Sequence, residues 1–167
     1  MTELTIPLAK AVDWAEAVIS FPTLEDAIQY AVRALSARSL TEAELIRKLR
    51  TRNASQAVID EVLERLRGLK FVDDGVIAAR AAEDAALGRW GIQRKLSQRG
   101  VSKNLIEDAL LIRDSDADLE AAQSLVERYG RQWTGKTSYH KAVSFLMRRG
   151  FSGDVVRKAL GEWAQAR

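Results

Sequence analysis

Apolar residues follow the same pattern in three separate stretches of this chain. The stretches are residues 45–66, 92–113 and 142–163, which begin 47 and then 50 residues apart. Each has a leucine in its first half, then an adjacent apolar pair and a second leucine: Leu49, Leu96 and Leu146; Val58–Ile59, Leu105–Ile106 and Val155–Val156; Leu63, Leu110 and Leu160. The pair and the second leucine have the spacing of one helix face. A recurrence of this length indicates tandem helical repeats.

Polar residues between the apolar stretches mark the expected helix ends. Side chains suited to N-cap positions stand at Thr23, Thr41, Ser55 and Ser102, and Glu44 completes a capping box with Thr41. Residues suited to a left-handed helix stop stand at Asn53, Gly100 and Gly150. A further helix is expected from Asp73 or Asp74 to about Leu87, and another over residues 116–129.

These signals predict an all-α fold of three tandem three-helix, helix-turn-helix-like repeats in an elongated, curved arrangement. The repeats are expected at residues 25–70, 71–113 and 114–167. Residues 1–24, which hold both prolines, are interpreted as an acidic N-terminal arm that can form a short amphipathic helix. Proteins built in this way usually present an extended surface to a partner, so we expect an interaction protein that is not an enzyme.

The residue types that support most catalytic chemistry are missing or isolated. The chain has no cysteine, which excludes disulfides, thiolate metal sites and thiol nucleophiles. The single histidine, His140, has no second histidine to share a metal. No stretch has the roughly 20 apolar residues of a membrane span, and the first residues do not resemble a signal peptide. We therefore expect a cytoplasmic monomer without a metal, a cofactor or catalytic residues.

Charge is unevenly distributed although the formal net charge is only +3. Residues 1–26 carry five acidic side chains and one basic one, whereas residues 128–149 carry six basic side chains and no acidic one. Basic residues concentrate on the second helix of each repeat. This pattern favours an acidic partner, either a protein or a nucleic-acid backbone, and a solvated helix face is the alternative.

The tryptophans allow two interpretations. Trp90, Trp133 and Trp163 have the chemistry to stack on nucleic-acid bases, but tryptophan at a repeat junction more often packs internally. Trp133, in a loop rich in glycine and arginine, is expected to be the exposed one.

Four segments in order resemble the RecX family, the regulators of the bacterial RecA recombinase. They are residues 34–49 (ALSARSLTEAELIRKL), 71–74 (FVDD), 90–101 (WGIQRKLSQRGV) and 145–152 (FLMRRGFS). The resemblance covers about residues 27–163. Two features depart from the family pattern: Asp73 stands where asparagine is common, and the N-terminal extension is acidic.

The resemblance implies three tandem three-helix repeats and a regulatory role in DNA repair, homologous recombination and the SOS response. RecX-like proteins bind in the groove of RecA filaments and inhibit recombinase, ATPase and coprotease activities. The family supplies no catalytic residues, so the partner-binding surface is inferred from charge alone. Its predicted residues are Arg47, Lys48, Arg52, Arg94, Lys95, Arg99, Lys141, Arg148 and Arg149.

A second function stays open, which is direct binding of single- or double-stranded DNA through the basic repeats. Acidic residues on the third helices, such as Glu107 and Asp108, oppose insertion of those helices into a DNA groove. Reversing the charges of Arg94, Lys95 and Arg99 together is expected to weaken filament binding while leaving the protein folded.

Overall fold

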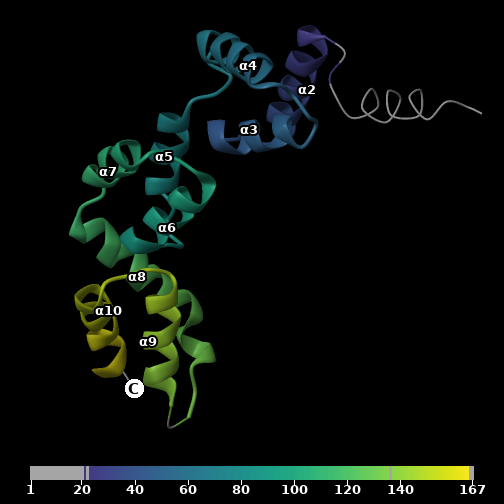
Figure 1. Ribbon diagram of the computed structural model, residues 1–167. Coiled ribbons are helices and arrows are strands. Elements are labelled where there is room, and N and C mark those ends of the chain that lie inside the picture. The colour runs from purple at the N-terminus through teal and green to yellow at the C-terminus, as the bar shows by residue number, and fades with distance from the viewer. Residues whose placement is uncertain (1–20, 22, 136, 166–167) are drawn as a thin grey trace, which may run out of the picture. The chain divides into compact units, whose positions relative to one another are not determined.

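The computed structural model describes residues 21, 23–135 and 137–165, and this part of the chain is helical without a strand. The elements are α2 (Leu24–Ala37), α3 (Glu42–Arg50), α4 (Gln56–Gly68), α5 (Asp74–Ala82), α6 (Arg89–Arg99), α7 (Lys103–Leu111), α8 (Ser115–Tyr129), η1 (Gly130–Gln132), α9 (Ser138–Arg148) and α10 (Gly153–Gln165) (Figure 1). The all-α prediction is confirmed. The expected helix in the N-terminal arm lies outside the described residues.

The chain divides into two compact units, one ending at Asp73 and the other beginning at Asp74. The first unit holds α2, α3 and α4, and the second holds the remaining helices. The three repeat boundaries and the elongated, curved arrangement stay predictions.

Each group of three helices encloses its own apolar core, and the repeated pattern supplies the central side chains. The first-half leucines Leu49, Leu96 and Leu146 are all fully buried. The second leucines of the pattern are also buried, in three separate clusters. Because full burial of a leucine stabilises a fold by about 1.5–3 kcal/mol, the repeated leucines contribute substantially to the stability of each core.

The predicted capping residues and left-handed stops agree with the structure, with one exception. Thr41 and Glu44 form the capping box, and the hydroxyl groups of Thr23 and Ser55 accept backbone hydrogen bonds at the starts of α2 and α4. The stops adopt positive φ angles of 54°, 85° and 86° at Asn53, Gly100 and Gly150. Ser102 is the N-cap residue of α7, but its side chain makes no capping hydrogen bond.

Within the second unit, the start of α6 is capped by atoms from beyond α7. Gly88 is its N-cap residue, without a side chain that could accept a hydrogen bond. The N–H of Gly88 donates to the carbonyl of Arg149 (3.0 Å), and the N–H of Trp90 donates to the carbonyl of Gly150 (3.1 Å). The turn between α9 and α10 thus supplies the acceptors that the first turn of α6 needs.

Two glycines allow this close approach. A Cβ on Gly150 would lie 1.9 Å from the backbone nitrogen of Gly91, and a Cβ on Gly91 would lie 2.0 Å from the carbonyl oxygen of Arg149. Only residues without a Cβ fit where the two backbones touch.

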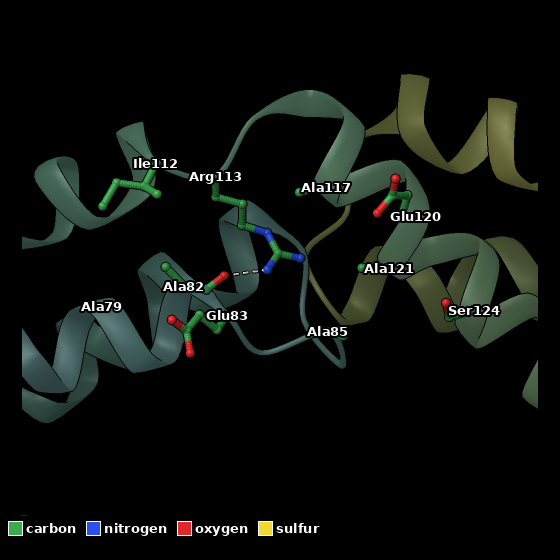
Figure 2. Close-up of a pocket in the computed structure, with 10 residues that line it drawn as sticks. All are labelled: Ala79, Ala82, Glu83, Ala85, Ile112, Arg113, Ala117, Glu120, Ala121 and Ser124. Atoms are coloured by element: carbon green, nitrogen blue, oxygen red, sulfur yellow. Dashed lines mark hydrogen bonds between the residues drawn. The ribbon is translucent and has the colours of Figure 1, made fainter.

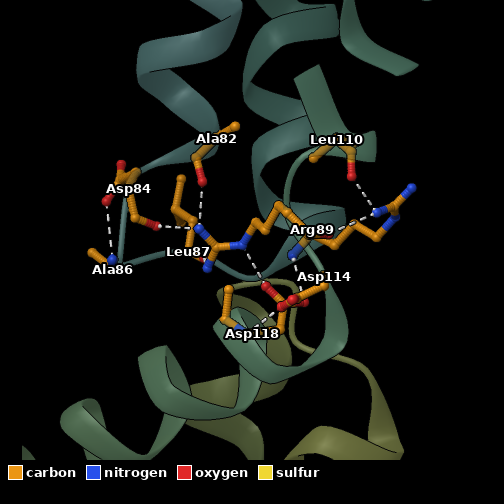
Figure 3. Close-up of polar contacts among 10 residues, drawn as sticks. Ala82, Asp84, Ala86, Leu87, Arg89, Leu110, Asp114 and Asp118 are labelled. Carbon is orange, nitrogen blue, oxygen red and sulfur yellow. Dashed lines mark hydrogen bonds and ion pairs between the residues drawn. The ribbon is translucent and has the colours of Figure 1, made fainter. Parts of the chain in front are cut away.

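A buried ion pair lies at the same junction. The guanidinium of Arg113 donates to the Asp118 carboxylate at 2.6 Å, and the two side chains are only 5% and 8% exposed. Arg113 also donates to the carbonyls of Ala82, Asp84 and Leu87. The other Asp118 oxygen accepts from the backbone N–H of Arg89, whose side chain donates to the carbonyl of Leu110 (Figure 3).

This network corrects one predicted boundary. The first helix of the second repeat was expected to continue to about Leu87, but α5 ends at Ala82. The Arg113 guanidinium binds the carbonyls of Ala82 and Leu87, and the residues between them form an irregular turn. A buried cation with three carbonyl acceptors stabilises this early end of the helix.

Candidate partner-binding surface

Three of the exposed residues in the second unit lie together where α6 meets the end of α9. The Arg94 guanidinium donates to the carbonyl of Arg148 at 2.9 Å, which places the two basic residues side by side. Trp90 is one helical turn before Arg94 on the same face of α6, and its side chain is 59% exposed. We call Trp90, Arg94 and Arg148 the α6–α9 patch.

The other predicted cations of α6 have different partners. The Lys95 ammonium lies 3.0 Å from the Asp84 carboxylate. Burial acts to raise the pKa of Asp84, but the Ala86 N–H, the Lys95 ammonium and the Arg113 guanidinium outweigh it and hold this pKa below its ordinary value. Arg99, at the end of α6, is half-buried. Lys95 and Arg99 therefore have structural surroundings that Arg94 does not share.

The two other cations associated with α9 differ from each other. Lys141 is exposed and precedes Arg148 by two turns on the same helix face, so it extends the basic surface of the α6–α9 patch. Arg149 is half-buried, and its guanidinium carbon lies 3.7 Å from the centre of the Phe145 ring. This cation–π contact gives Arg149 a packing role inside the third repeat.

In the first unit, the structure brings two of the three predicted cations together. Lys48 and Arg52 line one cleft, whereas the neighbouring residue Arg47 does not line it and donates to the carbonyl of Ala43 on its own helix. Consecutive helical residues point about 100° apart, which explains the separation of Arg47 from Lys48.

The prediction that Trp133 is the exposed tryptophan is wrong. Its side chain is 6% exposed and packs edge-on against Phe145 and Trp163, with ring centres 5.2 and 5.7 Å apart. The short turn η1 folds the loop back, so the indole joins the core of the third repeat. Among the tryptophans in the described part of the chain, Trp90 is the exposed one, and its position one turn before Arg94 on a polar helix was the signal in the sequence.

An open cleft of about 410 Å³ lies beside Arg113 in the second unit. Alanines form much of its lining, and Glu83 and Glu120 are at its rim (Figure 2).

Within the described residues, no group of three or more histidine, cysteine, aspartate or glutamate side chains is arranged to hold a metal ion. The same part of the chain contains no helix long and apolar enough to cross a membrane.

Comparison with known proteins identifies the family. Residues 27–66 match the family model described as RecX, first three-helix domain, and residues 116–160 match RecX, third three-helix domain. The regulatory protein RecX of Deinococcus radiodurans is 33% identical over 145 residues, which cover 84% of this chain and 70% of that protein. The chain belongs to the RecX family. The resemblance noted in the sequence is thereby confirmed, and the family's name assigns the chain a regulatory role.

Other RecX proteins extend the comparison. The Geobacillus kaustophilus protein is 30% identical over 157 residues, and the match covers 90% of this chain but 58% of that protein. For the Geobacillus sp. WCH70 protein the match covers 49% of its length. The crystal structure of RecX from Lactobacillus salivarius has a TM-score of 0.71 and 23% identity, and covers 85% of this chain and 97% of that one. This structural similarity supports the RecX fold.

Proposed function

We propose that this protein binds the filament of a RecA recombinase and inhibits its recombinase, ATPase and coprotease activities. In this role it modulates DNA repair, homologous recombination and the SOS response in the cytoplasm. It acts as a monomer that occupies a surface, without a cofactor or chemistry of its own. The observation that carries the proposal is the α6–α9 patch on a chain of the RecX family.

The composition of the patch supports a protein partner. Tryptophan and arginine are the residues that most often dominate binding energy at protein interfaces, and Trp90 and Arg94 lie one turn apart with the tryptophan well exposed. Exposed cations of the patch and Lys141 would favour an acidic surface on the partner and speed the encounter.

The decisive experiment measures DNA-dependent ATP hydrolysis by the cognate recombinase as this protein is added. Inhibition is expected at substoichiometric amounts, since one bound regulator stops growth of a filament of many subunits. Unchanged hydrolysis at an equimolar amount would contradict the proposal.

Replacing Trp90 with alanine should raise the concentration needed for half-maximal inhibition about 30-fold, because an exposed tryptophan anchor contributes about 2 kcal/mol or more at a hot spot. Arg94→Glu should act in the same direction, and its defect should shrink as salt is raised, because salt screens the repulsion between the new carboxylate and an acidic partner surface. The structure favours these single changes over the triple reversal, since reversing Lys95 would also break its ion pair with Asp84.

The matched control is Lys158→Glu, which reverses the charge of an exposed residue on α10. It should leave inhibition within about twofold of the unmodified protein. If Lys158→Glu and Arg94→Glu weaken inhibition equally, overall charge and not the α6–α9 patch governs binding.

A further inference from the structure

The cleft of about 410 Å³ beside Arg113 is separate from the α6–α9 patch, because no residue of the patch lines it. Its lining comes from the end of α5 and the turn that follows, from the end of α7 and from α8 (Figure 2). Its volume is within the range of about 300–1,000 Å³ that is typical of binding sites. Most of the lining is apolar, and these residues are Ala79, Ala82, Ala85, Ile112, Ala117 and Ala121.

Ile112 leaves an aliphatic side chain uncovered at this cleft. It is the C-cap residue of α7 and is 81% exposed, and the preceding residue, Leu111, is 77% exposed. Covering such side chains with another surface is favourable, roughly in proportion to the apolar area that is removed from water. Ile112 and the apolar lining therefore form a continuous surface that is suited to a partner.

Arg113 lines the cleft but does not make it basic. Its buried guanidinium pairs with the Asp118 carboxylate. The same guanidinium donates to the carbonyls of Ala82, Asp84 and Leu87. The positive charge is thus neutralised inside the protein, and the exposed charge at the cleft comes from carboxylates.

These carboxylates flank the apolar lining on different elements. Glu83 follows α5 and Glu120 is on α8, and both are exposed (Figure 2). Glu127 is exposed two turns after Glu120 on the same face of α8. Within the described part of the chain, no ion pair involves these three glutamates. An apolar cleft beside such carboxylates attracts a segment that combines aliphatic with basic side chains.

We propose that this cleft binds a basic amphipathic helix of a partner protein. Aliphatic side chains on one face of the helix would enter the cleft beside Ile112, and lysines or arginines at the edges of that face would meet Glu83 and Glu120. The short alanine side chains of the lining leave room for larger aliphatic ones. A nucleic acid fits less well, because the carboxylates would repel its phosphates. The proposal does not depend on the recombinase, and its test leaves the recombinase out.

The experiment titrates the full chain into a low concentration of a fluorescent leucine–lysine amphipathic peptide and measures anisotropy. The peptide has about 14 residues, which form roughly four helical turns. Because the chain has a net charge of +3, its overall charge opposes a basic peptide, and saturable binding below about 100 μM protein would report a local acidic site. Peptides with glutamate in place of lysine, or with serine in place of leucine, should each bind at least about tenfold more weakly.

The apolar part of the site is tested by Ile112→Ser, which should weaken binding of the leucine–lysine peptide about tenfold because an aliphatic contact is lost. The exposure of Ile112 predicts that urea unfolding of this variant stays unchanged. Leu69→Ser is the matched control, since Leu69 is the C-cap residue of α4 and is 66% exposed. This control should change the affinity less than twofold.

The charged part is tested by Glu120→Lys, which should weaken binding of the leucine–lysine peptide about fivefold and strengthen binding of the glutamate peptide. Both effects should shrink as salt is raised. Glu64→Lys makes the same change of charge at an exposed position of α4, and it should alter both affinities less than twofold.

Three results would overturn the proposal: no binding of the leucine–lysine peptide, undiminished binding by Ile112→Ser, or equal weakening by Glu64→Lys and Glu120→Lys. Sedimentation equilibrium of the full chain tests a second copy as the occupant. Dimers that Ile112→Ser abolishes would place another copy in the cleft and would also overturn the proposal, whereas a monomer that binds the peptide supports it.

Discussion

Replacing Arg113 with methionine should destabilise the second unit by about 3–5 kcal/mol. The change would leave the Asp118 carboxylate buried without its guanidinium partner, although the Arg89 N–H would still donate to it, and would remove the donor for the carbonyls of Ala82, Asp84 and Leu87. An unpaired buried charge costs far more than the pair itself contributes, so the loss should exceed that of a surface ion pair.

Urea unfolding monitored by hydrogen exchange over residues 74–129 would measure the effect. The double variant Arg113→Met, Asp118→Asn should be less destabilised than the sum of its single changes by about 1–3 kcal/mol, because neutralising both partners removes the uncompensated charge. Arg157→Met is the matched control: its ion pair with Asp154 is 75% and 79% exposed, and the change should cost less than about 0.5 kcal/mol. A loss below 1 kcal/mol for Arg113→Met would contradict this account.

Gly150→Ala should destabilise the same unit by about 2–5 kcal/mol. An alanine at a φ of 86° costs about 1–2 kcal/mol, and its Cβ would overlap the backbone of Gly91, which adds about 1–3 kcal/mol of overpacking. Because backbone atoms cannot rotate away as a side chain can, the start of α6 must move. The hydrogen bonds from Gly88 and Trp90 to the α9–α10 turn should then exchange faster.

Gly135→Ala separates the two contributions. Gly135 has a φ of 82°, and a Cβ there would meet no atom within 4 Å. Its replacement should cost only the backbone term of about 1–2 kcal/mol. If both variants lose the same free energy of unfolding, the contact between Gly91 and Gly150 has no effect on stability beyond the backbone term.

The Gly150→Ala change also bears on the proposed function. Arg94 and Arg148 stand on opposite sides of the junction that Gly91 and Gly150 close. Moving α6 relative to α9 would separate the two basic residues of the α6–α9 patch. Gly150→Ala should therefore weaken inhibition of a recombinase even under conditions in which the helices remain formed.

The buried arginine could have been found from the repeats. Position 113 aligns with Leu66 and Trp163, the last residues of the three repeated stretches. Leu66 is fully buried, so the alignment places residue 113 at a core position, where the chain has an arginine. A charge at a core position requires a buried partner, but nothing in the local pattern identified Asp118 or the carbonyls of residues 82–87.

For the candidate site, too, the sequence indicated some residues but not their neighbours in the fold. Charge counting selected Arg94 and Arg148, which the structure brings together, but it could not separate them from Lys95, which pairs with Asp84, or from Arg149, which packs on Phe145. These two cases arise because a helix sequence shows which residues share a face but not which neighbour covers that face.

By itself, the sequence determined the helices, their caps and stops, the three repeated cores and the RecX resemblance. Those features depend on residues within a turn or two of each other, so periodicity and capping chemistry record them. Only the tertiary structure decided that Gly91 meets Gly150, that Arg113 ends α5 and that Trp133 is buried. Most of these outcomes depend on contacts between residues some 20–60 positions apart, and such contacts leave no period in the sequence.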